Sequence, residues 1–431
     1  MNISRKLPGI AEALQAMETG ALRASALAEQ CLARITERNA DVQAFVNQDA
    51  RKILRQARDV DEGRLSGLLR GIPFAAKDVI ETADYPTACG SPIHAGRHTG
   101  RDAACVALSR EQGAVLMGKV ATSEFATQSP GPTRNPLDLA HTPGGSSSGS
   151  AAAVADGMAM FAWGTQTTGS ITRPAIYCGV VGYKPSFGLV STAGMNVLSP
   201  SHDTVGVLAR SVEDAAAAVL GQHGQRFRPA PPDSRPRLGI CLSSQWAHAS
   251  EAARLALHEW ANRLGASGFT ISQQTLPADF DRLVDEQARL VAYDARQALT
   301  HERRTDEARL SPRLKARIAA GENITLAEYL AMQQRAAQAR GRAEALFQDV
   351  DALVYLATDG EAEKGLENSG SPRYGALWTL LHLPTIALPV AAGPNGLPLG
   401  VQLIGRPGQD EALLQIAALA AVHGEWRAPH S

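Results

Sequence analysis

Three short segments carry side chains suited to breaking an amide bond. They are Lys77–Asp78, the stretch Pro143–Ser150 (PGGSSSGS) and the stretch Gly164–Ala175 (GTQTTGSITRPA). Two loops rich in glycine and hydroxyl side chains, on either side of one apolar segment, can bring two serines to one point. They also leave backbone N–H groups free to bind an anion. Together with the lysine, the loops predict a Ser-Ser-Lys hydrolytic site.

The glycine- and serine-rich stretch has two competing interpretations. A flexible linker has the same composition, but this stretch runs directly into the apolar segments Ala151–Ala155 and Met158–Trp163, which indicates that it packs against a core. It also matches a Gly-x-Ser-x-Gly elbow centred on Ser147. That motif needs a preceding strand and a His-Gly-Gly-Gly segment. Pro143-Gly144 interrupts such a strand and the segment is absent from the sequence, so the two-serine interpretation is favoured.

Size and charge favour a small-molecule enzyme. The chain has 431 residues, more than one simple core usually serves, which favours one large α/β unit with an appended helical part. Lysine and arginine number 42 against 43 aspartates and glutamates, for a net charge of −1. Because no long run of one sign occurs, neither nucleic acid nor an anionic membrane is expected as the main partner.

No targeting, disulfide or metal signal stands out. The first eight residues hold no apolar core, and Leu14–Ala33 is interrupted by charges, so a cytoplasmic protein is expected. Five scattered cysteines without a Cys-x-x-Cys pair indicate reduced core residues. His94 and His98 lie among glycines and a proline without a third ligand nearby, which favours a solvated loop over a metal site. No metal is predicted.

Hydrophobic periodicity divides the chain into four segments. Helical spacing comes first, then short apolar runs between Gly, Pro and Ser, then long amphipathic stretches, and finally a strand pair with a closing helix. These correspond to an N-terminal helical layer (1–70), a core with the catalytic motifs (71–215), a mostly helical substrate-side region (216–370) and C-terminal elements that complete the core (371–431). Strands are expected at Ile72–Ala76, Val115–Met117, Met158–Trp163, Val180–Tyr183, Val205–Leu208, Arg237–Leu242, Thr385–Ala391 and Gly400–Ile404.

The motifs resemble the amidase signature family. The resemblance rests on Gly71-Ile72-Pro73 before Lys77-Asp78, on Asn135-Pro136 before the Pro-Gly-Gly-Ser stretch, and on Gly169-Ser170 followed by Arg173-Pro174-Ala175. It covers residues 71–215 well and returns over 378–422. The arginine three places after the second serine resembles the malonamidase-like branch. The family resemblance implies an α/β fold, a mixed twisted sheet with helices on both faces, and chemistry without a metal or an organic cofactor.

The resemblance also assigns roles to the three chemical groups. Ser170 is the implied nucleophile, Ser146 the bridging serine after a cis Gly145–Ser146 bond, and Lys77 the base. A lysine can accept a proton at neutral pH only if burial or a neighbouring charge lowers its pKa from about 10.4. Lys77 is therefore expected to be buried and neutral when substrate arrives.

An oxyanion hole is expected on backbone N–H groups from Thr167, Thr168, Gly169 and Ser170. Thr168 replaces a glycine that many relatives carry before the nucleophile. Either this position already has a conformation that tolerates a Cβ, or the β-branched side chain narrows the site.

Two further residues are candidates for substrate binding. Arg173 could hold a substrate carboxylate with two N–H groups, or it could form a structural ion pair, for instance with Asp203. Thr165 could line the same pocket or simply end a strand.

The sequence thus predicts hydrolysis of a small linear amide through an acyl-enzyme, with release of ammonia or an amine; a carboxylated amide is one hypothesis for the substrate. One alternative is the amidase subunit of an amidotransferase built from several subunits. Another, of a different class, is a binding protein that keeps the fold without turnover. A homodimer or a small helical partner is compatible with the amphipathic N-terminal helices.

Overall fold

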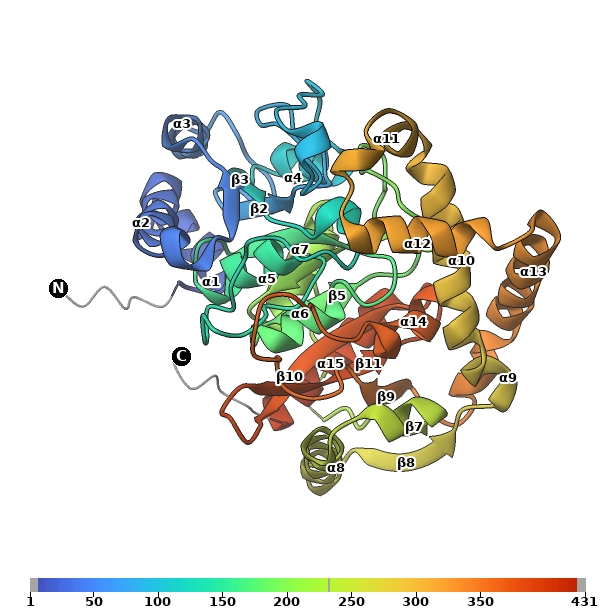
Figure 1. Cartoon of the computed structure of the whole chain (residues 1–431). Coiled ribbons are helices and arrows are strands. Elements are labelled where there is room, and N and C mark those ends of the chain that lie inside the picture. Colours follow the sequence, from blue (N-terminus) through green and yellow to red (C-terminus); the bar gives the residue numbers. More distant parts are fainter. Residues whose placement is uncertain (1–6, 232, 425–431) are drawn as a thin grey trace.

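A single mixed sheet runs through the molecule. The computed structural model describes residues 7–231 and 233–424, and within them eleven strands form one sheet in the order β1-β3-β2-β4-β6-β5-β10-β11-β9-β7-β8 (Figure 1). The strands are β1 Phe45–Asn47, β2 Pro73–Lys77, β3 Val115–Val120, β4 Phe161–Gln166, β5 Val181–Lys184, β6 Thr204–Ala209, β7 Arg237–Leu242, β8 Thr270–Thr275, β9 Ala352–Leu356, β10 Thr385–Ala392 and β11 Pro398–Ile404. Pairing is parallel between β2 and its neighbours β3 and β4, and between β7 and its neighbours β8 and β9; the other pairs are antiparallel.

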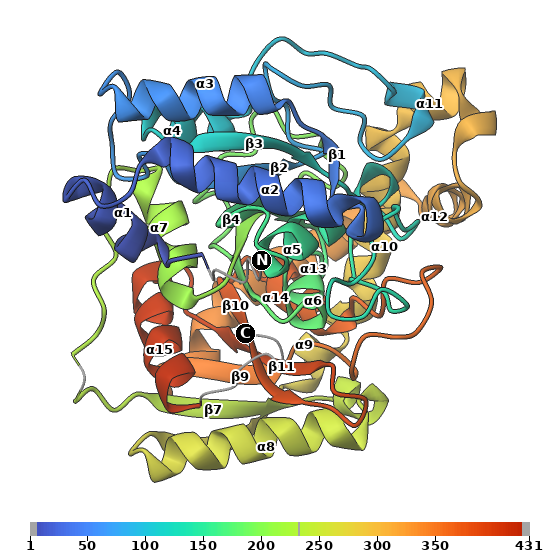
Figure 2. The same ribbon diagram turned by 90° about the vertical axis from the view of Figure 1, so that its left-hand side faces the viewer.

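Helices cover both faces of this sheet. They are α1 Ile10–Glu18, α2 Ala24–Val42, α3 Ala50–Asp61, α4 Ala104–Glu111, α5 Ser148–Ala155, α6 Thr172–Tyr177, α7 Val212–Gly221, α8 Glu251–Ala266, α9 Ala278–Asp281, α10 Leu283–Ala298, α11 Thr300–Thr305, α12 Pro312–Glu322, α13 Leu326–Arg342, α14 Arg373–Leu380 and α15 Asp410–His423. Figure 2 shows α5 and α6 on one side of the central strands and α7 and α15 on the other. The predicted mixed sheet with helices on both faces is confirmed.

The expected strands match the observed ones to within a few residues, and three strands were not predicted. β1 has three residues and lies inside the helical N-terminal layer, and β8 at the other edge of the sheet is mostly exposed and polar. β9 is fully buried, and its continuous apolar run has no period that separates a strand from a helix. Missed strands of this kind carry little local signal because pairing partners define them.

The helical segment from α9 to α13 folds back over the core rather than forming a separate layer. α10 packs against α12, α13 and α14, and Figure 1 shows these helices along one side of the sheet. This segment therefore faces the loops that follow β2 and β4.

The state of the cysteines and the apolar character of the helices can be read directly from the structure. All five cysteines are free and buried, as predicted. None of the helices in the described ranges is both long and apolar enough to cross a membrane.

Candidate active site

Lys77 is the last residue of β2, in the interior of the sheet. Its side chain is fully buried. The ammonium nitrogen Nζ lies 2.7 Å from Ser146 Oγ and 2.8 Å from Thr165 Oγ1. Because β2 and β4 are parallel neighbours, their carboxyl ends meet at one edge, where ligands bind in sheets of this kind. The structure thus brings the predicted base and the predicted bridging serine into direct contact.

The surroundings of Lys77 favour its neutral form. Burial lowers the pKa of Lys77 to about 7; the Asp203 carboxylate opposes this shift and the Arg173 guanidinium adds to it. A large fraction of Lys77 is therefore an uncharged amine with a free lone pair slightly above neutral pH.

Ser146 follows a cis peptide bond from Gly145, as the family resemblance implies. Gly144, one residue earlier, has φ +76°, and a Cβ there would stand 2.8 Å from Pro174 Cα in α6. Only glycine fits this close approach of two backbones. The Pro-Gly-Gly turn thereby places Ser146 beside Lys77, at the start of the segment that leads into α5.

Ser170 lies four residues after β4, and its carbonyl oxygen accepts a hydrogen bond from the Ser147 N–H at 3.3 Å. The two serine loops are thus joined by their backbones. Ser170 is 9% exposed, whereas Ser146 is 1% and Lys77 0% exposed. Among the residues that the structure describes, no hydrogen bond joins the Ser146 and Ser170 hydroxyls. The order of exposure places Ser170 outermost, where an entering substrate arrives first.

The loop from Thr167 to Ser170 presents free backbone donors. In the described part of the chain, none of its four N–H groups has a hydrogen-bond acceptor. Its carbonyls are occupied instead: Gln287 Nε2 donates to the Thr167 oxygen at 2.8 Å, and Thr379 Oγ1 donates to the Thr168 oxygen at 3.0 Å. A loop with fixed carbonyls and unpaired N–H groups is suited to bind an oxyanion.

Gln166 fixes the far side of this loop. Its Oε1 accepts hydrogen bonds from the N–H groups of Ile171 at 2.8 Å and Thr172 at 3.1 Å. These two donors are consequently withdrawn from the site, whereas the N–H groups of Thr167–Ser170 stay unpaired within the described residues.

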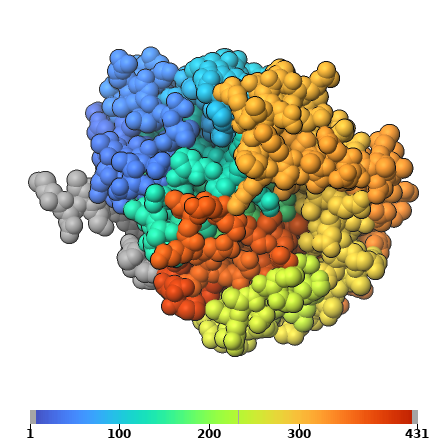
Figure 3. Space-filling model, in the orientation of Figure 1, coloured from blue at the N-terminus to red at the C-terminus, as the bar shows by residue number. Residues whose placement is uncertain are grey.

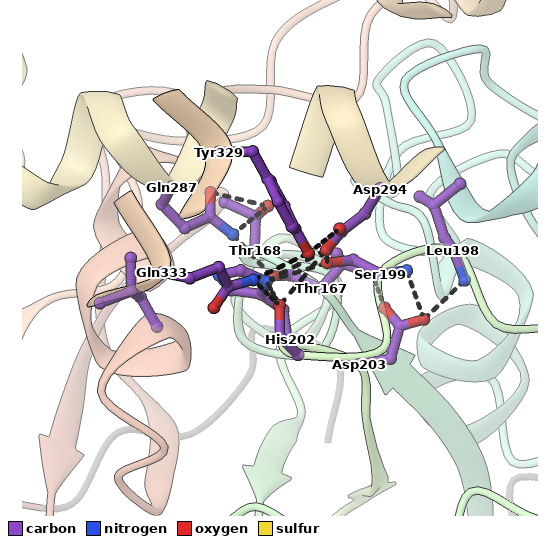
Figure 4. Close-up of polar contacts among 12 residues, drawn as sticks. Thr167, Thr168, Leu198, Ser199, His202, Asp203, Gln287, Asp294, Tyr329 and Gln333 are labelled. Atoms are coloured by element: carbon purple, nitrogen blue, oxygen red, sulfur yellow. Dashed lines mark hydrogen bonds and ion pairs between the residues drawn. The ribbon is translucent and has the colours of Figure 1, made fainter. Parts of the chain in front are cut away.

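A buried polar network connects the Thr167–Ser170 loop, called the oxyanion loop below, to the helical segment from α9 to α13 (Figure 4). Thr167 Oγ1 donates to Asp203 Oδ1 at 2.5 Å, and Asp203 Oδ2 accepts from the backbone N–H groups of Leu198 and Ser199. The Ser199 hydroxyl continues the network to Asp294 of α10 at 2.5 Å. Burial raises the pKa of Asp203 to about 6, while these hydrogen bonds oppose the rise. Loop and helices are thereby held as one unit.

Thr168 has a conformation that tolerates a Cβ. It is not among the residues with positive φ, and its hydroxyl lies 3.2 Å from Gln287 Nε2. The first of the two expectations for this residue therefore agrees with the backbone: the side chain contacts α10.

Arg173 is buried beside the cis peptide. Its Nη2 donates to the Gly145 carbonyl at 2.5 Å and lies 3.5 Å from Ser369 Oγ. Nε and Nη1 are buried without a hydrogen-bond partner. Within the described ranges Arg173 forms no ion pair, so the alternative of a pair with Asp203 is wrong. That carboxylate is already occupied by Thr167 and two backbone N–H groups.

Two other predicted residues are placed as follows. Thr165 is 3% exposed and its hydroxyl holds Lys77, so its role in substrate binding stays a prediction. His94 is wrongly predicted as solvated: its Nε2 lies 3.0 Å from Glu302 Oε1, because α11 folds over this loop. In the ranges described, no three His, Cys, Asp or Glu side chains gather in a metal-binding arrangement.

No sequence motif points to three residues that contact the Thr167–Ser170 loop and Arg173 from distant parts of the chain, namely Gln287, Ser369 and Thr379. Single Gln, Ser and Thr residues in helices and loops carry no local signal. Only the packing of α10, α14 and the segment before α14 brings them to the site.

The chain resembles known proteins over nearly its whole length. The family model described as Amidase matches residues 26–414. One subunit of the glutamyl-tRNA(Gln) amidotransferase of Symbiobacterium thermophilum is 33% identical, over 92% of this chain and 93% of that protein. A crystal structure of an amidase superposes with a TM-score of 0.88 at 29% identity, over 96% and 99% of the two chains.

The peptide amidase of Stenotrophomonas maltophilia superposes with a TM-score of 0.84 at 26% identity, over 100% of this chain and 99% of that one. Coverage is therefore nearly complete in both directions, and the matched region includes Lys77, Ser146 and Ser170. This chain belongs to the amidase family and is an amide C–N hydrolase.

Proposed function

We propose that the protein hydrolyses a small linear amide carrying a carboxylate, with Ser170 as nucleophile, Ser146 as proton relay and Lys77 as base. One observation carries the catalytic part of this proposal: Lys77 Nζ lies 2.7 Å from Ser146 Oγ in a hydrogen bond, and the pKa of the buried Lys77 is lowered. Its support is that a buried neutral amine can take a proton which a buried ammonium cannot.

Acylation begins with two proton transfers. As Ser170 Oγ attacks the amide carbon, its proton passes to Ser146 Oγ, and the Ser146 proton passes to Lys77 Nζ. The N–H groups of the Thr167–Ser170 loop bind the oxyanion of the tetrahedral intermediate. Collapse breaks the C–N bond, and the relay runs backwards to protonate the leaving nitrogen.

Deacylation repeats the sequence with water. A water molecule loses its proton through Ser146 to Lys77 and attacks the Ser170 ester, and the acid leaves as the proton returns to Ser170 Oγ. Ammonia or an amine and a carboxylic acid are the products, and the enzyme regains its starting state.

Ammonia release by the purified chain alone tests the proposed function. The panel contains short amides with and without a carboxylate, and Ser170→Ala serves as the blank. Release above that blank supports a self-sufficient amidase. Silence across the whole panel contradicts it.

The pH dependence follows from the pKa of Lys77, which burial lowers to about 7. The base is active when neutral, so kcat/KM should rise between pH 6 and pH 8 with a midpoint near 7, and fall on acidification as the ammonium forms. Initial rates across pH 5–9 measure this. Lys184→Met provides the control, because Lys184 also has a pKa lowered to about 7 by burial. In the described part of the chain, however, it donates only to the Leu383 and Pro185 carbonyls. A flat profile, or a midpoint abolished by Lys184→Met, contradicts the assignment.

Arg173 supports the carboxylate preference. Two of its N–H-bearing atoms, Nε and Nη1, are buried and unpartnered. Burial lowers the pKa of Arg173 only to about 10, so it is charged at neutral pH. A buried guanidinium with two nitrogens left unpartnered is unfavourable by itself, and a substrate carboxylate supplies two acceptors at once.

Arg173→Ala should lower the rate ratio of malonamate to a neutral amide of equal length by about 10- to 100-fold, the worth of one or two charge-assisted hydrogen bonds. Both rates should fall, because the Gly145 carbonyl also loses its contact with Nη2. The ratio of the two rates isolates the effect of the substrate carboxylate. Arg173→Gln keeps a side-chain N–H donor, so it tests whether the rate with the neutral amide recovers while the rate with malonamate does not. An unchanged ratio contradicts carboxylate binding by Arg173.

A second candidate is the amidase subunit of an amidotransferase. The observation in its favour is the 33% identity with the glutamyl-tRNA(Gln) amidotransferase subunit over nearly the full length of both chains. Affinity purification of the tagged chain from its own cells distinguishes the two functions. A stoichiometric partner whose addition is required for ammonia release favours the second candidate.

A further inference from the structure

Asp203 is a buried carboxylate directly before β6, opposite the end of β4. The two strands are antiparallel and pair as far as the last residue of β4, so Thr167, which follows β4, lies opposite Asp203. The Thr167 hydroxyl donates to Asp203 Oδ1 at 2.5 Å, and Asp203 is 5% exposed. Its other partners in the described ranges are the backbone N–H groups of Leu198 and Ser199, so no cation is in contact with it.

The hydrogen bonds of Asp203 favour its charged form. The N–H groups of Leu198 and Ser199 lie 2.7 Å and 3.0 Å from Oδ2 and can only donate, and the Thr167 hydroxyl supplies a third donor. They oppose the effect of burial, which raises the pKa of Asp203 to about 6. Asp203 is therefore an anion at neutral pH and above.

The base of the proposed relay lies on the other side of the same strand. β2 flanks β4 on the side away from β6, and Lys77 Nζ lies 2.8 Å from Thr165 Oγ1. Thr165 and Thr167 are alternate residues, about 7 Å apart along an extended chain and on the same face. Gln166 between them donates to Thr379 of α14 instead. Two threonines at the end of β4 thus hold the lysine and the carboxylate.

Two buried charges act on Lys77, in opposite directions. The Asp203 carboxylate raises the pKa of Lys77, and the Arg173 guanidinium lowers it. Conversely, Lys77 is the charged group that acts on Asp203. Next to Asp203, His202 is neutral because burial lowers its pKa to about 3. Without Asp203, an ammonium on Lys77 would form beside a buried guanidinium with no protein anion to offset it.

The helical segment from α9 to α13 covers this carboxylate. The Ser199 hydroxyl, next to one donor of Asp203, donates to Asp294 of α10 at 2.5 Å (Figure 4). Figure 3 shows the segment, in yellow and orange, over the right-hand side of the molecule. Charges from which water is excluded interact more strongly than charges in water.

We propose that Asp203 is a positioning residue of the relay, which anchors the oxyanion loop through Thr167 and is the counter-anion of the ammonium that forms on Lys77. The inference rests on the proposed function because it concerns the same proton transfer. As Ser170 attacks, the Ser146 proton reaches Lys77 and creates a positive charge. A carboxylate that is already held in place stabilises this charge without reorganisation, so Asp203 acts on the transition state more than on substrate binding.

Asp203→Asn removes the charge and can keep the hydrogen bonds. The amide oxygen accepts from the two backbone N–H groups, and the amide nitrogen donates to the Thr167 hydroxyl, which then accepts. The midpoint of the kcat/KM profile should fall by about 0.5 to 1 pH unit and kcat by about three- to tenfold, because the ammonium on Lys77 loses its anion. KM should stay within about twofold. Asp203→Glu should move the midpoint back, because it restores the charge.

Asp294→Asn is the matched control. It removes a carboxylate that is also 5% exposed and that accepts from the Ser199 and Tyr329 hydroxyls at 2.5 Å and 2.8 Å. Asp294 is not among the groups that act on Lys77, so the midpoint should not move. An unchanged midpoint in Asp203→Asn, or an equal shift in both variants, overturns the proposal.

A titration without substrate separates this inference from the proposed function. The isotope-labelled Cε resonance of Lys77, assigned by its loss in Lys77→Met, is followed by NMR against pH. The pKa of Lys77 should be lower in Asp203→Asn than in the unchanged protein. A lower pKa without any ammonia release supports the counter-anion and contradicts the proposed function; ammonia release with equal pKa values does the reverse.

Circular dichroism establishes that each variant is folded. If Asp203→Asn does not fold, Asp203→Ser repeats the titration, since its hydroxyl can still accept from a backbone donor. Failure of both variants to fold would mean that the carboxylate serves the fold, and would overturn the proposal.

Discussion

Replacing Ser170 with alanine should lower kcat by about 10⁴-fold or more, because covalent catalysis ends when the nucleophile is removed. The substitution removes one partly exposed hydroxyl for which the structure gives no hydrogen bond within the described residues. Its effect on the free energy of unfolding should accordingly be small. Initial rates of ammonia release, together with the melting temperature, measure both quantities.

Ser150→Ala is the matched control for this prediction. Ser150 lies in the same serine-rich stretch, but its hydroxyl donates to the Trp163 carbonyl at 3.1 Å and lies outside the proposed relay. Its loss should cost about 1 kcal/mol of stability and leave kcat within a few-fold. Comparable inactivation by both substitutions would mean that Ser170 acts through the fold and not as the nucleophile.

Replacing Lys77 with methionine should lower kcat by about 10³-fold, in the range expected for loss of a positioned general base. Methionine fills a similar volume in the buried site, so the sheet should keep its packing. Ser146 Oγ would lose the amine nitrogen 2.7 Å away that takes its proton in the proposed relay. The rate should also lose its dependence on pH near 7.

Lys184→Met tests whether burial of a lysine alone explains such a loss. Lys184 is equally buried and has its pKa lowered to about the same value as Lys77. It contacts two backbone carbonyls and neither Ser146 nor Ser170. Activity per folded molecule should therefore survive in Lys184→Met. Rates in Lys77→Met that match this control would contradict a base role for Lys77.

The sequence was informative where chemistry requires particular residue types at particular places. The Pro-Gly-Gly turn is predictable because Gly144 needs a positive φ and the close approach to α6. The lysine and the two serines are recognisable because they lie in motifs with several fixed neighbours. The strands of the core were predictable from apolar runs between turn residues.

The surroundings of the site were not predictable. Gln287 and Asp294 lie two helical turns apart on α10 and contact the loops at Thr167 and Ser199, yet neither side chain differs in type from the exposed polar residues around it. The proposed ion pair between Arg173 and Asp203 does not form. Asp203 instead accepts hydrogen bonds from the Thr167 hydroxyl and from two backbone N–H groups. Such partnerships depend on tertiary packing and leave no pattern in the local sequence.

Identification of the acylated residue tests whether Ser170 is the nucleophile. The enzyme is quenched with acid during turnover of a cleaved amide, digested, and analysed by peptide mass spectrometry. The peptide containing Ser170 should gain the mass of the acyl group, and Ser170→Ala should show no adduct and no turnover. An acyl group on Ser146 or on another residue, or turnover that persists in Ser170→Ala, would contradict this role of Ser170.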